Sequence, residues 1–176
     1  EVAMRMDPTA DPFAAPAADA DAPVERFGEK EANDFSWANL LNAYTCTECG
    51  RCTSECPANL TGKKLSPRKI MMDTRDRIEE IGVNIAANGS FVDDGRSLLG
   101  DYITNEELWA CTSCNACVQA CPIDIDPLNI IMKLRNFATM EESSAPGALN
   151  AMMTNVENNG APWPFNQMDR ANWINE

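Results

Sequence analysis

Two copies of one cysteine pattern constrain this chain more than any other feature of its sequence. The first copy is Cys46-Thr-Glu-Cys49-Gly-Arg-Cys52-Thr-Ser-Glu-Cys56-Pro57, and the second is Cys111-Thr-Ser-Cys114-Asn-Ala-Cys117-Val-Gln-Ala-Cys121-Pro122. Both have the spacing C-x2-C-x2-C-x3-C-P, which holds cubane iron–sulfur clusters in bacterial proteins. Two-residue gaps let one tight loop direct three thiolates at three irons of the same cube, with loop N–H groups pointing at the sulfurs. The motifs account for all eight cysteines and predict two [4Fe–4S] clusters.

The fourth cysteine of each motif is expected to serve the cluster of the other motif. It lies one helical turn beyond the third cysteine, where it is poorly placed for the same cube, and in two-cluster ferredoxins it binds the other cluster. One cluster is therefore assigned Cys46, Cys49, Cys52 and Cys121, and the other Cys111, Cys114, Cys117 and Cys56.

Disulfides and zinc are the two other structural uses of eight cysteines. Disulfide frameworks rarely repeat one spacing twice. Structural zinc sites usually pair two C-x2-4-C knuckles across a longer gap. A third cysteine at the same spacing in both copies, with proline after each fourth cysteine, favours clusters over both alternatives. The spacing leaves open a cluster that lacks one iron.

Composition and charge exclude several classes of function. The 176 residues include no histidine, which excludes a Rieske centre, a histidine-held haem and a Ser–His or Cys–His catalytic pair. We therefore expect a non-catalytic subunit. The formal net charge of −13 argues against nucleic-acid binding. No apolar run long enough for a membrane span and no signal peptide is found, and thiolate clusters indicate a reducing, cytoplasmic compartment.

Helix signals precede both motifs. Asp34 or Ser36 can cap a short helix that ends at Tyr44 and is expected to bury Trp37, Leu40 and Leu41. Before the second motif, Thr104-Asn-Glu-Glu107 has the pattern of a capping box. Corresponding ligands of the two motifs are 65 residues apart, which also aligns Tyr44 with Trp109. The two halves are therefore predicted to be an internal repeat with pseudo-twofold symmetry, whose aligned aromatics shield the clusters from water.

Helix signals also follow both motifs. Ser66-Pro67 begins a helix that is expected to stop at Gly82, and Asp126-Pro127 begins one that reaches Met140. A last helix is expected from Pro146 to about Asn158, and no strand pattern occurs. Basic residues gather along the helix after the first motif, where we expect a solvated face paired with acidic residues rather than a docking patch: Lys63, Lys64, Arg68, Lys69, Arg75 and Arg77.

These signals divide the chain into three parts. Residues 1–33, rich in Ala, Pro and Asp, are predicted to be a disordered or extended arm. Residues 34–145 are predicted to be an all-α domain with two cluster-binding loops between short helices. Residues 146–176 are predicted to be a C-terminal helix and a partner-contacting tail, whose Trp163 and Phe165 rest on the domain itself or on another subunit.

Residues 35–163 resemble the alpha-helical ferredoxin domain. The two motifs carry the resemblance, together with Leu65-Ser66-Pro67, Leu108-Trp109-Ala110-Cys111-Thr112, Cys121-Pro122-Ile123-Asp124-Ile125-Asp126-Pro127 and Asn158-Asn-Gly-Ala-Pro-Trp163. The domain occurs in the dicluster subunit of heterodisulfide reductase and in the iron–sulfur subunits of glycerol-3-phosphate, lactate and glycolate oxidation systems. It also occurs in membrane-bound dehydrogenases of electron-transfer flavoprotein.

The resemblance implies an electron-transfer subunit of a heterodisulfide-reductase-like, respiratory complex. Such a subunit relays single electrons between a flavin donor and a CCG-type or membrane redox partner. The implied partners are a CCG-domain subunit, a flavoprotein or a membrane subunit, and the implied location is the cytoplasm or the cytoplasmic face of a membrane complex. The alternative is a free soluble dicluster ferredoxin carrier or a redox sensor.

Overall fold

The computed structural model describes residues 27–174, and the regular secondary structure in that range is helical. In chain order the helices are η1 (Ala32–Asp34), α1 (Trp37–Thr45), α2 (Arg51–Ser54), α3 (Pro57–Leu60), α4 (Pro67–Asn88), η2 (Leu98–Tyr102), α5 (Asn105–Ala110), α6 (Ala116–Gln119), α7 (Pro127–Met140), α8 (Gly147–Asn159) and η3 (Gln167–Ile174). One isolated bridge joins Leu99 and Ile103. The predicted all-α class is confirmed, and residues 1–26 of the predicted arm lie outside the described residues.

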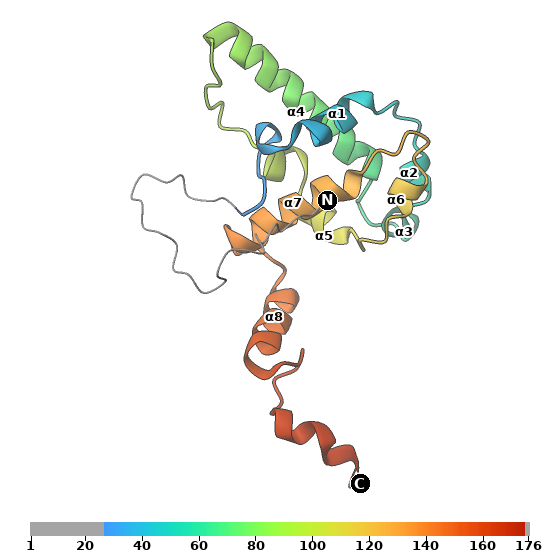
Figure 1. Ribbon diagram of the computed structural model, residues 1–176, viewed down its shortest axis with the longest axis vertical. Coiled ribbons are helices and arrows are strands. Elements are labelled where there is room, and N and C mark those ends of the chain that lie inside the picture. Colours follow the sequence, from blue (N-terminus) through green and yellow to red (C-terminus); the bar gives the residue numbers. More distant parts are fainter. Residues whose placement is uncertain (1–26, 175–176) are drawn as a thin grey trace, which may run out of the picture.

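Helices α4 and α7 form the centre of the domain, where they pack against each other (Figure 1). Both begin as predicted, with a side-chain cap followed by proline. The Lys69 amide donates to Ser66 Oγ at 3.3 Å, and the Asn129 amide donates to Asp126 Oδ1 at 3.0 Å. One apolar face of each helix is buried: Ile70, Met71 and Ile81 on α4, and Ile130, Ile131, Leu134, Phe137 and Ala138 on α7.

The prediction that the helix ends at Gly82 was wrong, because α4 continues past this residue. It ends at Asn88, where Gly89 adopts a left-handed φ of 80° and its amide donates to the Ile85 carbonyl at 2.8 Å. Glycine inside a helix costs only about 1 kcal/mol relative to alanine, so it does not by itself end one. The helix ends instead at the left-handed glycine that closes its last turn.

Helix α1 presents a different face to the core from the one predicted. Trp37 and Leu41 are 77% and 51% exposed, whereas Asn39 and Ala43 are buried. Asn39 Nδ2 donates to Asn129 Oδ1 of α7 at 3.2 Å. With this polar contact at the interface, Leu40 packs partly buried against the core while Trp37 and Leu41 point outward, so the predicted burial of Trp37 and Leu41 is wrong.

The segment before α1 is packed onto the two central helices. Gly28 has a φ of 87°, and a Cβ there would lie 2.5 Å from the Phe137 nitrogen and 2.6 Å from the Lys133 carbonyl oxygen, so α7 leaves room only for glycine. Lys133 Nζ contacts Glu29 Oε1 at 2.5 Å, and Ala32 is fully buried. The described end of the predicted arm therefore belongs to the packed domain.

Most of the predicted basic face on α4 is paired with acidic residues, as expected. Lys69 contacts Asp73 at 2.7 Å, for example. Arg77 differs, because its side chain is fully buried rather than solvated. Its guanidinium donates to both Glu31 oxygens and to both Asp94 oxygens, at 2.7–3.1 Å. Arg77 thereby ties the segment before α1 and the loop after α4 to the same helix.

Helix α8 and η3 leave the helical domain and extend away from it (Figure 1). Helix α8 spans nearly the predicted range and ends at Gly160, which has a left-handed φ of 62°. No residue of α8 or η3 is buried, and Trp163 and Phe165 are exposed. Among the described residues, none of the helices combines the length and the apolar character that a bilayer-spanning helix needs.

Candidate iron–sulfur cluster sites

Each cysteine motif forms a tight loop followed by a one-turn helix. In the first loop Glu48 and Gly50 have φ values of 57° and 82°, and in the second loop Ser113 and Asn115 have φ values of 55° and 61°. Left-handed residues thus stand at corresponding positions, 65 residues apart. Glycine and asparagine are the residues that adopt this conformation most readily. The two loops have matching backbones, while a pseudo-twofold relation between the complete halves stays a prediction.

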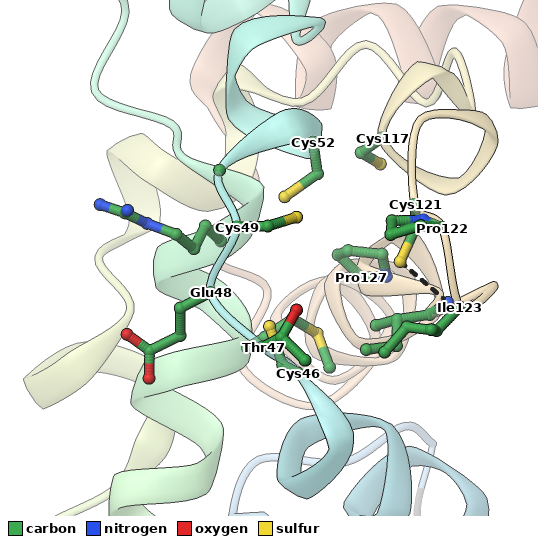
Figure 2. A pocket seen from close by; sticks show the side chains of 14 residues that line it. Cys46, Thr47, Glu48, Cys49, Cys52, Cys117, Cys121, Pro122, Ile123 and Pro127 are labelled. Atoms are coloured by element: carbon green, nitrogen blue, oxygen red, sulfur yellow. Dashed lines mark hydrogen bonds between the residues drawn. The ribbon is translucent and has the colours of Figure 1, made fainter.

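The first loop lines a pocket together with two cysteines of the second motif, Cys117 and Cys121. Its cysteines are Cys46, Cys49 and Cys52, joined across the pocket by Cys121. Figure 2 shows these side chains around a shared space, with Glu48 directed away from it. Apolar side chains contribute much of the remaining wall: Met71, Pro122, Ile123, Ile125 and Pro127.

The second loop lines a second pocket in the same manner. Cys111, Cys114 and Cys117 are joined there by Cys56 of the first motif. The wall is again largely apolar: Pro57, Leu65, Pro67, Leu128 and Ile131. Cys117 also lines the first pocket (Figure 2), and because it lines the second as well, the two pockets adjoin at this residue. The sequence motifs alone did not identify these apolar walls, although several of their residues start the helices that follow each motif.

The surroundings of the cysteines suit a negatively charged cluster held by thiolates. All eight cysteines lie in the described range and are free thiols. Backbone amides point at sulfurs, with Ser113 N 3.4 Å from Cys111 Sγ and Ile125 N 3.3 Å from Cys121 Sγ. Burial, reinforced by the nearby Cys111, raises the pKa of the Cys117 thiol to about 12. A bare thiolate is therefore unfavourable there, and iron would supply the charge that stabilises it.

The aromatic residues before each motif do not line the pockets. Tyr44 is 49% exposed, and Trp109 is partly buried against the core. The Arg135 guanidinium lies over the Trp109 ring, 4.9 Å from its centroid. Among the residues that line the two pockets, aliphatic side chains rather than these aromatics keep water away from the cysteines.

Residues 45–125 match the family model of the 4Fe-4S dicluster domain. The chain is 33% identical over 185 aligned positions to a probable iron–sulfur-binding oxidoreductase, FadF, of Bacillus subtilis, with 89% of this chain and 26% of that protein covered. It is 33% identical to an EtfAB:quinone oxidoreductase of Syntrophomonas wolfei, with 87% and 24% covered. It is 34% identical to one subunit of a CoB-CoM heterodisulfide reductase of Methanosarcina acetivorans, with 62% and 54% covered.

The chain spans about a quarter of the length of the first two relatives and about half of the third. The matched residues include all eight cysteines and most of the residues that line the two pockets. Residues 45–125 therefore belong to the 4Fe-4S dicluster domain family, which binds two [4Fe–4S] clusters, and the chain is a relative of FadF-like iron–sulfur oxidoreductases and of iron–sulfur subunits of heterodisulfide reductases.

Proposed function

We propose that this chain is an electron-transfer iron–sulfur subunit that relays single electrons through two [4Fe–4S] clusters. The observation that carries the proposal is Cys117, which lines both cysteine pockets. Two redox centres that share a wall residue are close enough to exchange electrons directly. The chain provides no histidine for acid–base or nucleophilic chemistry, so its contribution is to hold and tune the clusters.

In this proposal each cluster takes three cysteines from one motif and one from the other. The first is bound by Cys46, Cys49, Cys52 and Cys121, and the second by Cys111, Cys114, Cys117 and Cys56. When bound, the clusters supply one-electron chemistry at potentials set by charge, hydrogen bonds and solvent exposure. The chain's own residues set those conditions, because the amides of Ser113 and Ile125 donate toward ligand sulfurs and the aliphatic walls exclude water.

Each pocket has one exposed cysteine, Cys49 in the first and Cys114 in the second. A relay needs one point where electrons enter and one where they leave, and the exposed cysteine of each pocket gives its cluster such a point. We propose a flavin donor on one side and a CCG-type or membrane partner on the other, in a heterodisulfide-reductase-like complex, and the similarity to an EtfAB:quinone oxidoreductase and to a heterodisulfide reductase subunit supports a redox complex of this kind. Since quinones dissolve in membranes, we place the complex at the cytoplasmic face of a membrane.

The segment after residue 146 supports a fixed subunit over a free soluble carrier or redox sensor. Its exposed apolar side chains include Met152, Met153, Val156, Trp163, Phe165, Met168, Trp173 and Ile174. A free carrier would leave all of them in water, whereas a partner subunit would cover them.

The test is affinity purification of the tagged chain from native, anaerobic extract, followed by electron counting. We expect a stable complex with other redox subunits and uptake of one electron per cluster from dithionite. The purified chain alone is expected to turn over no metabolite. Substrate turnover by the isolated chain would contradict the proposal, and a cluster-loaded monomer without a stable partner would support the free carrier instead.

A further inference from the structure

Arg135 of α7 lies directly beside the second pocket. Its guanidinium donates to the Leu108 carbonyl from Nε at 3.1 Å and from Nη2 at 2.8 Å, and to the Cys111 carbonyl from Nη2 at 2.6 Å. Nη1 lies 3.4 Å from Ser113 Oγ. The same group stacks over Trp109, 4.9 Å from the ring centroid. Five contacts therefore fix one positive charge at the first cysteine of the second motif.

This charge has no acidic partner in the part of the chain that the structure describes. Of the buried and half-buried lysines and arginines within residues 27–174, all except Arg135 form ion pairs: Lys30, Lys69, Arg75, Arg77 and Lys133. Arg135 is partly buried and contacts carbonyls, a hydroxyl and a ring instead. Withdrawing a cation from water is costly unless an anion compensates. The anion that this site lacks is what a thiolate-bound cluster at Cys111 provides.

We propose that Arg135 is the fixed counter-charge of the second cluster and makes it the more easily reduced of the two. Reduction adds one negative charge to a cluster, and a nearby cation in a poorly solvated place stabilises the reduced form. The inference rests on the proposed function, since it assigns Cys111, Cys114, Cys117 and Cys56 to that cluster.

The first pocket has no equivalent of Arg135. The residue 65 positions earlier is Ile70, which is buried and uncharged. Arg68 lines the first pocket but is exposed, so solvent and salt screen its charge. Arg75 approaches the same loop but pairs with Glu48 at 2.5 Å. The asymmetry gives the relay a direction, from the first cluster to the second.

The test is an EPR-monitored redox titration of the cluster-loaded chain and of three variants. Arg135→Gln removes the charge and keeps hydrogen-bond donors, and Arg135→Lys keeps the charge and loses the planar fork. Arg170→Gln is the matched control, because it makes the same change in net charge in η3, outside the helical domain. For Arg135→Gln we expect at least a tenfold shift of one cluster's reduction equilibrium, which is 59 mV toward lower potential for one electron. Arg135→Lys and Arg170→Gln should move it by less than half as much.

The signal that shifts must belong to the second cluster. It is identified as the signal that Cys114→Ser alters and Cys49→Ser does not. Unchanged potentials in Arg135→Gln would overturn the inference, as would equal losses in Arg135→Gln and Arg135→Lys, which would assign the effect to hydrogen bonding.

A measurement on the unchanged protein keeps the inference testable if Arg135→Gln loses its cluster. In that protein the second cluster must have the higher potential, and the opposite order would contradict the role of Arg135. Iron and sulfide analysis separates the two proposals. Absence of clusters from the unchanged protein would remove the proposed function, whereas intact clusters with the wrong order of potentials would remove only the inference.

Discussion

Cys56 and Cys121 stand at the ends of their motifs, and the structure turns each of them toward the loop of the other half. Cys56 is buried and lines one pocket with Cys111, Cys114 and Cys117, and Cys121 lines the pocket of the first loop. The one-turn helices α2 and α6 contact each other, which brings the end of each motif to the opposite pocket. At the scale of single residues, this exchange links the two cluster sites.

Substitution of the exchanged cysteines tests the ligand assignment. We expect Cys121→Ala to damage the same cluster as Cys49→Ala, and Cys56→Ala to damage the same cluster as Cys114→Ala. The reason is that each alanine removes one thiolate from a set of four. The measurement is the EPR spectrum of each reduced variant, prepared anaerobically. If Cys121→Ala instead matched Cys114→Ala, each motif would serve its own cluster and the crossed assignment would be wrong.

At the scale of elements, Arg77 holds three segments of the chain together. It lies on α4 and binds Glu31 before α1 and Asp94 in the loop after α4. The guanidinium holds the pKa of the Asp94 carboxyl well below its usual range. Because the Arg77 side chain is fully buried, its removal takes away the cation that both carboxylates contact and leaves Asp94 only its 3.7 Å contact with Arg96.

We expect Arg77→Met to destabilise the cluster-loaded protein by about 3 kcal/mol, at the lower end of the range for a broken buried pair, because both carboxylates keep some solvent. For a chain of this size that lowers the melting midpoint by roughly 6–12 °C. The measurement is circular dichroism during anaerobic heating at a fixed rate. Arg96→Gln is the control, since the exposed Arg96–Glu80 pair should contribute less than about 1 kcal/mol. Equal midpoints for Arg77→Met and the unchanged protein would contradict this role.

Local signals in the sequence predicted where helices begin, and contacts between helices decided the rest. The caps at Ser66, Thr104 and Asp126 form as expected, because each depends on residues within one turn. The buried face of α1 could not be predicted in this way, since it depends on Asn39 meeting Asn129, 90 residues later. The predicted helix end at Gly82 was wrong because the local signal was too weak, since a single glycine does not prevent a helix from continuing.

The same distinction holds for the cluster sites. The motifs predicted that Cys121 joins the first loop and Cys56 the second, and the pockets bring these cysteines together, while the ligand set of each cluster stays a prediction. The motif spacing did not predict the contribution of α4 and α7, which add Met71, Leu128 and Ile131 to the apolar walls and place the half-buried Arg135 beside Cys111.

At the scale of the whole molecule, the chain is a helical core that carries two adjoining cysteine pockets and a C-terminal extension with apolar side chains in solvent (Figure 1). The chain spans about a quarter of the length of the first relatives, and the working unit of the proposed function is its complex with partner subunits. Within that unit we propose that the pockets carry electrons and the extension contacts a partner.

The most direct test of this account is the EPR spectrum of the dithionite-reduced protein, recorded on anaerobically purified samples of known iron and acid-labile sulfide content. We predict about eight iron and eight sulfide ions per chain, four of each per cluster, with signals that interact because the two sites adjoin. Zinc without sulfide would contradict the account and make the chain a structural adaptor. Two full clusters with signals that do not interact would contradict the shared wall at Cys117.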